Sequence, residues 1–222
     1  MRSTRLPGKI AADVCGMPLL GRVVSRLKAA AERVPGGMTV MVATSTSEVD
    51  DATEQLCREI GVGCFRGSED DVLARYLAAS AQLDDNDTVL RATADNCLYC
   101  PVRTAKIIAV HREKQADYTS IYSLSYVVPE VMQVGALREM ARRASLPFHR
   151  EHVTPYFREP EHRGEFNVTQ LPQTWEGLRP DIRLTVDTPE ELEKITWIYQ
   201  TLSDRGNTFS LEDIYELCMR QF

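Results

Sequence analysis

Residues 88–96 have the sequence TVLRATADN, in which a β-rich run is followed by a carboxylate. The run 88–93 is rich in β-branched and apolar residues, which is typical of a buried strand. Asp95 follows it directly, at the end of the strand where ligands bind in open α/β sheets. A carboxylate there suits Mg²⁺, which prefers oxygen ligands and substrate phosphates, or it caps the next helix. The pattern leaves both roles open.

The same order of strand, aspartate and helix returns near the C-terminus. Residues 181–189 are DIRLTVDTP, which predicts a strand over 181–186 that ends at Asp187. Thr188 suits an N-cap and Pro189 the first helical position, so a helix is expected over 188–202. Two carboxylates at separate strand ends can hold a cation between substrate oxygens. The alternative is that Asp187 binds no cation and is only the residue before the N-cap, Thr188.

Between these two stretches, short β-rich runs alternate with helical patterns. Further strands are expected at 38–44 (MTVMVAT), 62–66 and 117–121, and further helices at 49–60, 70–82, 101–114, 136–145 and 210–220. This alternation predicts an α/β fold with a mostly parallel sheet flanked by helices. No linker or repeat divides the chain, so a single domain over 1–222 is expected.

Composition excludes several classes of protein. The formal net charge is −6, which disfavours a broad nucleic-acid surface. No apolar run reaches the roughly 20 residues of a membrane span, and the N-terminus lacks the apolar segment of a secretory signal, so a cytoplasmic location is expected. Cys97 and Cys100 have metal-like spacing, but no second pair follows, which favours buried structural thiols over zinc ligands.

Other segments carry groups that can bind a ligand. Residues 3–9 (STRLPGK) form a basic loop whose backbone N–H groups, with Arg5 and Lys9, suit a triphosphate. A frayed basic terminus would have the same composition. Arg66 ends a predicted strand and Ser68 follows it, so both can face the same crevice. Glu151 and His152 are adjacent, without a nucleophile motif beside them.

Taken in order, these motifs resemble one family. They are STRLPGK (3–9), VAT (42–44), FRGSEDDVLARY (65–76), RATADN (91–96), REHVTPY (150–156) and DIRLTVDTPEELE (181–193). The chain resembles the cytidylyltransferases, in particular the spore coat polysaccharide biosynthesis protein F type. The enzymes that activate 3-deoxy-manno-octulosonate and the sialic acids are related to that type. The resemblance spans nearly the whole chain.

The resemblance implies a Rossmann-like nucleotidyltransferase fold, also called the nucleotide-diphospho-sugar transferase fold. It further implies Mg²⁺-dependent transfer of CMP from CTP to an acidic sugar, for surface polysaccharide synthesis, by a homodimer. Arg5 and Lys9 would meet the phosphates, and Asp95 and Asp187 would hold the metal. Residues near the nucleotide or the sugar would be Ser3, Thr4, Arg66, Ser68, Arg75 and Arg91. Those at the acceptor sugar, or in a small sugar-binding and dimerisation lobe around 123–175, would be Glu130, Glu151 and His152.

The sequence departs from the family pattern in two places. Relatives carry a central first strand immediately before the STRLPGK loop; here that strand is missing, and a start further upstream is expected. Cys97 and Cys100 stand where relatives usually have proline and aspartate. Three alternatives therefore stay open: a nucleotide-binding relative without activity, a nucleotidyltransferase that uses another nucleotide, and a glycosyltransferase. The last normally has an Asp-x-Asp pair, which the residues after Asp95 do not form.

Overall fold

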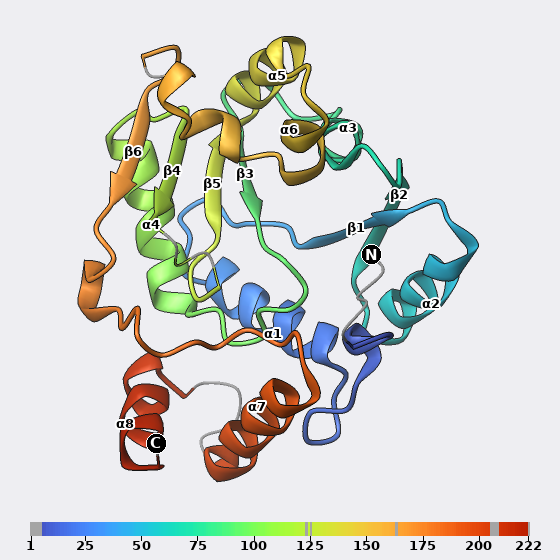
Figure 1. Cartoon of the computed structure of the whole chain (residues 1–222), viewed down its shortest axis with the longest axis vertical. Helices are drawn as coiled ribbons and strands as arrows, with labels where there is room; N and C mark the ends of the chain where they lie inside the picture. The colour runs from blue at the N-terminus through green and yellow to red at the C-terminus, as the bar shows by residue number, and fades with distance from the viewer. Residues whose placement is uncertain (1–5, 123, 125, 163, 205–208, 222) are drawn as a thin grey trace.

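The structure is a computed structural model that describes residues 6–122, 124, 126–162, 164–204 and 209–221. Helices surround two small sheets (Figure 1). The strands are β1 (Met41–Ser45), β2 (Gly63–Gly67), β3 (Thr88–Arg91), β4 (Tyr118–Ile121), β5 (Glu130–Gln133) and β6 (Val168–Leu171). The α-helices are α1 (Leu19–Ala31), α2 (Asp51–Glu59), α3 (Val72–Ala79), α4 (Pro101–Glu113), α5 (Val134–Arg143), α6 (Pro147–His152), α7 (Pro189–Thr201) and α8 (Leu211–Gln221). The 3-10 helices are η1 (Lys9–Ala11), η2 (Glu48–Asp50), η3 (Pro155–Phe157), η4 (Pro160–His162) and η5 (Trp175–Gly177).

The predicted α/β class is confirmed, but the prediction of a mostly parallel sheet is wrong for the larger sheet. β1 and β2 pair in parallel, and so do β4 and β6. In the four-stranded sheet, ordered β3-β5-β4-β6, β5 runs antiparallel to both of its neighbours. The connection 122–129 between β4 and β5 is shorter than the dozen or so residues that a parallel crossover needs. The chain therefore returns beside β4 in the opposite direction.

Most of the predicted helices are confirmed to within a few residues, whereas the strand predicted over 181–186 is wrong. Residues 183–186 belong to no ladder, although Leu184 and Val186 are fully buried in the main core. The backbone N–H of Val186 donates to the carbonyl oxygen of Asp95 at 3.0 Å. The alternation of apolar residues therefore arises because this extended segment is buried in the core, and not because it belongs to a sheet.

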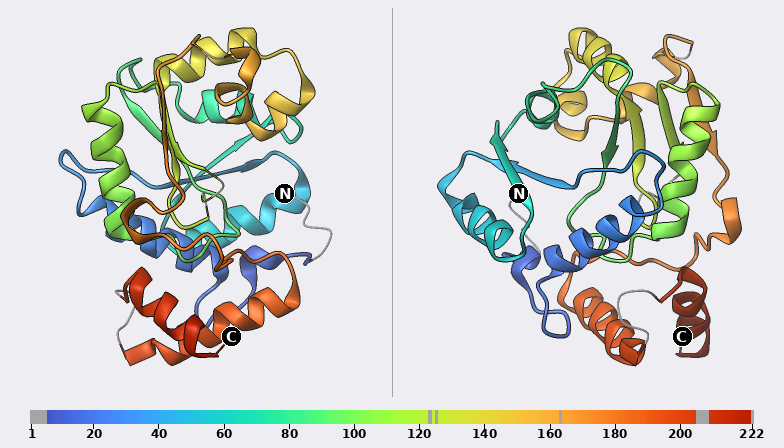
Figure 2. Two further views of the ribbon diagram at one scale, coloured as in Figure 1. Left: turned by 60° about the vertical axis from the view of Figure 1, so that its left-hand side comes forward. Right: turned by 180° about the vertical axis from the view of Figure 1, so that it is seen from behind.

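Five of the described helices lie at the two ends of the molecule. α3, α5 and α6 lie together at one end of the molecule, and α7 and α8 lie at the other, beneath α1 (Figures 1 and 2). The main core joins α1, α4, the larger sheet and the two C-terminal helices. Cys97 and Cys100 are buried in this core, and burial raises the pKa of Cys97 to about 12. No helix of the described residues is long and apolar enough to cross a membrane.

β1 of the smaller sheet and β3 of the larger sheet each have one edge without a partner strand among the described residues, and these two edges face each other. Thr46 donates its N–H to the carbonyl oxygen of Gly67 of β2. Because the backbone N–H and C=O groups of successive strand residues point to opposite edges, those of Met41 and Ala43 point away from β2. By the same reasoning, the bond from Val134 to Asp87 turns Thr88 and Leu90 of β3 away from β5. Within the described ranges, these four backbones form no hydrogen bonds at those edges.

Candidate functional site

Three of the predicted catalytic side chains converge where the segment after β3 meets the segment before α7. The ammonium nitrogen of Lys9, in η1, donates to Oδ1 of Asp187 at 3.0 Å and to Oδ2 of Asp95 at 3.5 Å. It also donates to the carbonyl oxygen of Val186 at 2.9 Å. All three charged side chains are mostly buried, since their exposed fractions are 13%, 19% and 30% for Lys9, Asp187 and Asp95. A cation therefore already compensates two neighbouring carboxylates.

The loop that carries Asp95 is shaped by Tyr99. The Tyr99 hydroxyl accepts hydrogen bonds from the backbone N–H of Thr93, at 2.8 Å, and from the Asn96 amide, at 3.3 Å. The same amide donates to Oγ1 of Thr93 at 2.6 Å. Burial raises the pKa of Tyr99 to about 12, so the hydroxyl keeps its proton. These bonds fold 93–96 tightly and fix the place where Asp95 leaves the core.

A capping box holds the second aspartate. Thr188 accepts from the N–H of Glu191, and the Glu191 carboxylate accepts from the N–H groups of Thr188, at 3.2 Å, and Asp187, at 2.7 Å. Arg183 pairs with the outer oxygen of Asp187 at 3.1 Å. The predicted start of α7 is thus confirmed, and the capping box orients Asp187 as well as beginning the helix.

One oxygen at this site has an unusual environment. Oδ1 of Asp95 is buried, yet it accepts no hydrogen bond from any residue that the structure describes. Such an atom is costly unless a bound group satisfies it. A hard cation with a preference for carboxylate oxygens would do so, and Asp187 would supply a second oxygen. The donor set therefore fits Mg²⁺.

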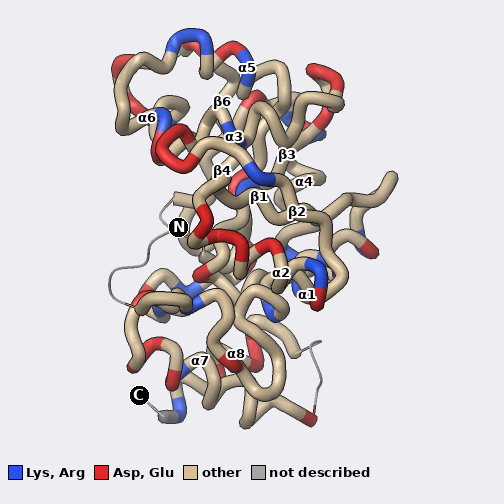
Figure 3. Tube along the Cα trace, turned by 90° about the vertical axis from the view of Figure 1, so that its right-hand side faces the viewer, with Lys and Arg blue, Asp and Glu red and all other residues tan. Residues whose placement is uncertain are grey.

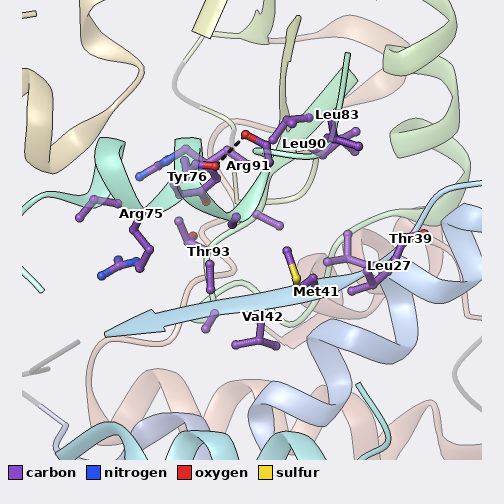
Figure 4. A pocket seen from close by; sticks show the side chains of 18 of the residues that line it. Leu27, Thr39, Met41, Val42, Arg75, Tyr76, Leu83, Leu90, Arg91 and Thr93 are labelled. Carbon is purple, nitrogen blue, oxygen red and sulfur yellow. Dashed lines mark hydrogen bonds between the residues drawn. The ribbon is translucent and has the colours of Figure 1, made fainter. Parts of the chain in front are cut away.

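Beside this site, the unpaired edges of β1 and β3 enclose a cleft of about 1480 Å³. Its two ends differ in character (Figure 4). Leu27, Met41 and Leu90 line one end, which is apolar, whereas Arg75, Tyr76, Arg91 and Thr93 lie toward the other end. Glu151 and His152 of α6 also line the cleft. Four of the predicted substrate-binding residues, namely Arg75, Arg91, Glu151 and His152, therefore share one cavity.

Glu130, the remaining acidic candidate, supports Arg91 from behind. Its carboxylate is 5% exposed and accepts from Arg91 at 2.9 Å, from Tyr118 at 2.5 Å and from Thr154 at 3.1 Å. Burial and the adjacent carboxylate raise the pKa of Tyr118, so its hydroxyl donates. With its oxygens occupied in this way, Glu130 orients the Arg91 guanidinium. The structure thus gives it a positioning contact that sequence reasoning did not foresee.

The backbone is strained where α6 meets this network. Val153 has φ 67° and ψ −65°, and the N–H of Thr154 donates to the carbonyl oxygen of His152 at 2.8 Å. This is a γ-turn of the rare, strained kind, in a β-branched residue that is fully buried. Strain of this kind persists where the surroundings over-determine it, and it is frequent at ligand sites. Here it sets His152 against the cleft and Thr154 against Glu130.

The other predicted residues lie elsewhere or outside the described ranges. Arg66 pairs with Asp51 at 2.5 Å and Glu54 at 3.1 Å, and so joins β2 to α2. The Ser68 hydroxyl accepts from the N–H of Asp71 at 3.0 Å. Neither side chain lines the cleft. Ser3, Thr4 and Arg5 fall outside the described residues, so the roles given to all five stay predictions.

Sequence reasoning missed one basic residue near Arg91. A smaller cavity of about 280 Å³ adjoins the cleft, with Arg91, His152 and Arg158 in its wall. Arg158 follows η3 at its C-cap. No motif marks this residue in the sequence, and only the fold brings it to a cavity with Arg91. Along the backbone trace, Lys and Arg positions are interspersed with Asp and Glu positions (Figure 3).

Comparison with known proteins places these features in one family. The family model for cytidylyltransferases matches residues 1–209. The spore coat polysaccharide biosynthesis protein SpsF of Bacillus subtilis (strain 168) is 32% identical over 214 residues, which are 96% of this chain and 88% of that protein.

Solved structures give the same answer. A cytidylyltransferase from Leptospira borgpetersenii serovar Hardjo-bovis superposes with a TM-score of 0.85 at 27% identity, covering 98% of this chain and 90% of that one. A CMP:2-keto-3-deoxy-manno-octonic acid synthetase in complex with CTP gives 0.65 at 16% identity, covering 90% and 94%. This likeness confirms the nucleotide-diphospho-sugar transferase type of fold. The chain belongs to the cytidylyltransferase family.

Proposed function

We propose that this protein transfers CMP from CTP to an acidic sugar in the presence of Mg²⁺, for surface polysaccharide synthesis. The observation that carries the proposal is the convergence of Lys9, Asp95 and Asp187, with Oδ1 of Asp95 buried and free of hydrogen bonds among the described residues. Asp95 and Asp187 would hold the metal. When bound, Mg²⁺ supplies positive charge against the phosphate oxygens. The SpsF relative supports the pathway assignment.

Lys9 would stabilise the leaving group. Its ammonium nitrogen lies within 3.5 Å of both carboxylates, so it would lie close to phosphates bound there and would offset the charge that develops on pyrophosphate. In the reaction, a sugar hydroxyl oxygen attacks the α-phosphorus of CTP. The new phosphorus–oxygen bond forms as the bond to pyrophosphate breaks, and the hydroxyl proton is lost to water. Positioning and charge provide the rate, as in phosphoryl transfer generally.

The acceptor would lie at the polar end of the cleft. Arg91 and Arg158 offer two guanidinium groups there, and His152 offers an imidazole. Guanidinium groups bind carboxylates with two parallel hydrogen bonds, which suits a sugar acid. The relative solved with CTP, whose name gives 2-keto-3-deoxy-manno-octonic acid as its sugar, supports this class of acceptor. We also propose that the lobe 123–175 contributes to the sugar site and to a homodimer.

One observation favours a second candidate function. The facing edges of β1 and β3 are unpaired in the described part of the chain, and the cleft between them is wide. A protein whose central sheet is interrupted could bind a nucleotide at Lys9, Asp95 and Asp187 and yet hold the acceptor too loosely for transfer. This protein would be a nucleotide-binding relative without turnover.

Pyrophosphate release separates the two functions. The full chain would be incubated with Mg²⁺, each of the four ribonucleoside triphosphates and a panel of acidic and neutral sugars. Release with CTP and an acidic sugar, lost in Asp187→Asn and kept in the surface control Asp181→Asn, supports transfer. CTP binding without release on any sugar supports the second function. Equal release with every triphosphate contradicts the assignment to CTP.

A further inference from the structure

A second cluster of ligand-type side chains lies apart from Lys9, Asp95 and Asp187. It joins His149 of α6 to Glu159 and to His162 of η4. One ligand atom from each residue lies within 4.8 Å of the others. Nε2 of His149 is 2.7 Å from Oε2 of Glu159, and Nε2 of His162 is 3.7 Å from that same oxygen. Two imidazoles thus point at one carboxylate oxygen.

The orientation of His162 is fixed from outside the cluster. Its Nδ1 donates to Oε1 of Glu165 at 3.0 Å, so Nε2 faces Glu159. Glu165 is itself held by Arg143 at 3.0 Å and by the hydroxyl of Tyr156 at 3.2 Å. The hydrogen bond from His162 holds the pKa of Glu165 below its usual value. A carboxylate behind the second ring nitrogen is the usual support of a metal-bound histidine.

The spacing of the ligand atoms suits a small ion. With zinc-to-nitrogen bonds of about 2.0 Å, tetrahedral geometry puts ligand atoms about 3.3 Å apart. The separations of 2.7 and 3.7 Å lie on either side of that distance. His149 is almost fully buried, whereas His162 and Glu159 are 21% and 31% exposed. The ion could therefore enter from solvent, and a water molecule could complete its shell.

The donor set discriminates between metals. Mg²⁺ and Ca²⁺ take oxygen ligands, so two imidazoles are a poor match for either. Imidazole suits zinc, and two histidines with one glutamate are a known zinc set. Without a metal, Nε2 of His149 donates to Glu159, whereas Nδ1 has no hydrogen-bond partner among the described residues and can take up the proton when a metal displaces it from Nε2. Nε2 can then be the unprotonated nitrogen that a metal requires.

We propose that His149, Glu159 and His162 bind a zinc ion that joins α6 to η4. α6 also carries Glu151 and His152, which line the cleft, and Val153, whose turn is strained. A zinc ion that links α6 to η4 would hold in place the part of the cleft wall that α6 forms. The inference goes beyond the proposed function and does not rest on it. Without a metal, the same cluster would be an ordinary set of histidine–glutamate pairs in a region of mixed charge (Figure 3).

Cobalt and zinc titrations test the proposal. The untagged full chain would be stripped with a chelator, dialysed and titrated with excess Mg²⁺ present, so that the Asp95 and Asp187 carboxylates are occupied. We expect one equivalent of Zn²⁺ to bind and to raise the melting temperature. Co²⁺ should give a tetrahedral visible spectrum without a thiolate charge-transfer band, which separates this site from the cysteines.

The variants identify the ligands. His162→Ala and Glu159→Gln should abolish the tight equivalent, and Glu165→Gln should weaken it by about 10- to 100-fold. The matched control His152→Ala removes another imidazole of α6 and should leave zinc binding unchanged. Circular dichroism verifies that each variant is folded. Absence of a tight equivalent in the wild type, a thiolate band, or equal binding by folded His162→Ala would overturn the proposal.

Discussion

Val186 donates its backbone N–H to the carbonyl oxygen of Asp95 at 3.0 Å, and this bond joins the segment after β3 to the segment before α7. Because the two segments are held together there, the side chains of Asp95 and Asp187 both reach the Lys9 ammonium group. The placement of these side chains depends on a fixed loop at 93–96 and a fixed start of α7, which Tyr99 and the capping box provide.

Replacement of Lys9 tests the charge balance of the site. Lys9→Met removes the cation between two carboxylates and the positive charge nearest the leaving group, so transfer should fall by about 100-fold or more. The measurement is steady-state pyrophosphate release. Lys106→Met, which removes an exposed lysine paired with Glu176, is the control and should retain activity. Equal loss in both variants would contradict the role of Lys9.

Thr188 tests the link between helix capping and the site. Thr188→Ala deletes one side of the capping box and should lower the free energy of unfolding by about 1 kcal/mol, as measured by urea denaturation. Because Glu191 also binds the N–H of Asp187, metal affinity should fall as well. Thr174 stands at the N-cap of η5 without a side-chain bond, so Thr174→Ala should change neither quantity. A Thr188→Ala variant with unchanged stability would show that the cap contributes nothing.

Stability should depend on pH through His111. Burial is the main reason that the pKa of this imidazole is lowered to about 4 from its ordinary 6.5. The charge of Asp117 opposes this shift, and the charge of Arg112 adds to it. The unfolded chain then binds the proton more readily between these values. The contribution of neutral His111 to the free energy of unfolding is therefore complete above pH 6.5 and is lost as the pH falls toward 4. The limiting slope of this loss is about 1.4 kcal/mol per pH unit.

His111→Asn isolates this effect, because the amide can still bond Thr119 but does not titrate. Urea melts from pH 4 to 7 should give a flatter dependence for this variant than for the wild type. His152→Asn, at an exposed histidine, should keep the wild-type slope. Parallel curves for all three proteins would rule out a contribution from His111.

The unpaired edge of β1 predicts self-association. An exposed strand edge recruits other strands, and a charge on the edge prevents this. Met41 is 45% exposed, so Met41→Lys should reduce concentration-dependent association in sedimentation velocity runs. Val102→Lys places the same charge on α4 at a residue that is 48% exposed. If both variants associate as strongly as the wild type, the edge is not the contact.

The sequence predicted individual elements better than their arrangement. The runs 62–66 and 101–114 gave β2 and α4 because period and flanking residues act locally. The antiparallel placement of β5 could not be predicted, since it depends on which strand the short 122–129 connection returns to. Residues 181–186 misled because burial alone produced the alternation of Leu184 and Val186.

The candidate site shows the same difference between residues that a local pattern indicates and residues that only the packing of the fold places. Asp95 and Asp187 were selected as candidates because each follows an apolar run and precedes a helix signal, and the structure brings both side chains to Lys9. Arg66 was expected at the crevice, but its guanidinium pairs with Asp51 and Glu54, which the sequence places on a separate helix. Arg158 and the strained turn at Val153 carry no local signal. Their positions follow only from the packing of the segments around β5 and α6.

Calorimetric titration of CTP into the full chain tests whether Lys9, Asp95 and Asp187 form a nucleotide site. With Mg²⁺ present, we expect micromolar CTP binding that weakens strongly in Asp95→Asn, whose amide is a poorer metal ligand, and stays unchanged in Asp181→Asn. Binding should also fall when Mg²⁺ is removed. Equal CTP affinity in the wild type and Asp95→Asn, or no binding by the wild type, would contradict a cytidylyltransferase site at Lys9, Asp95 and Asp187.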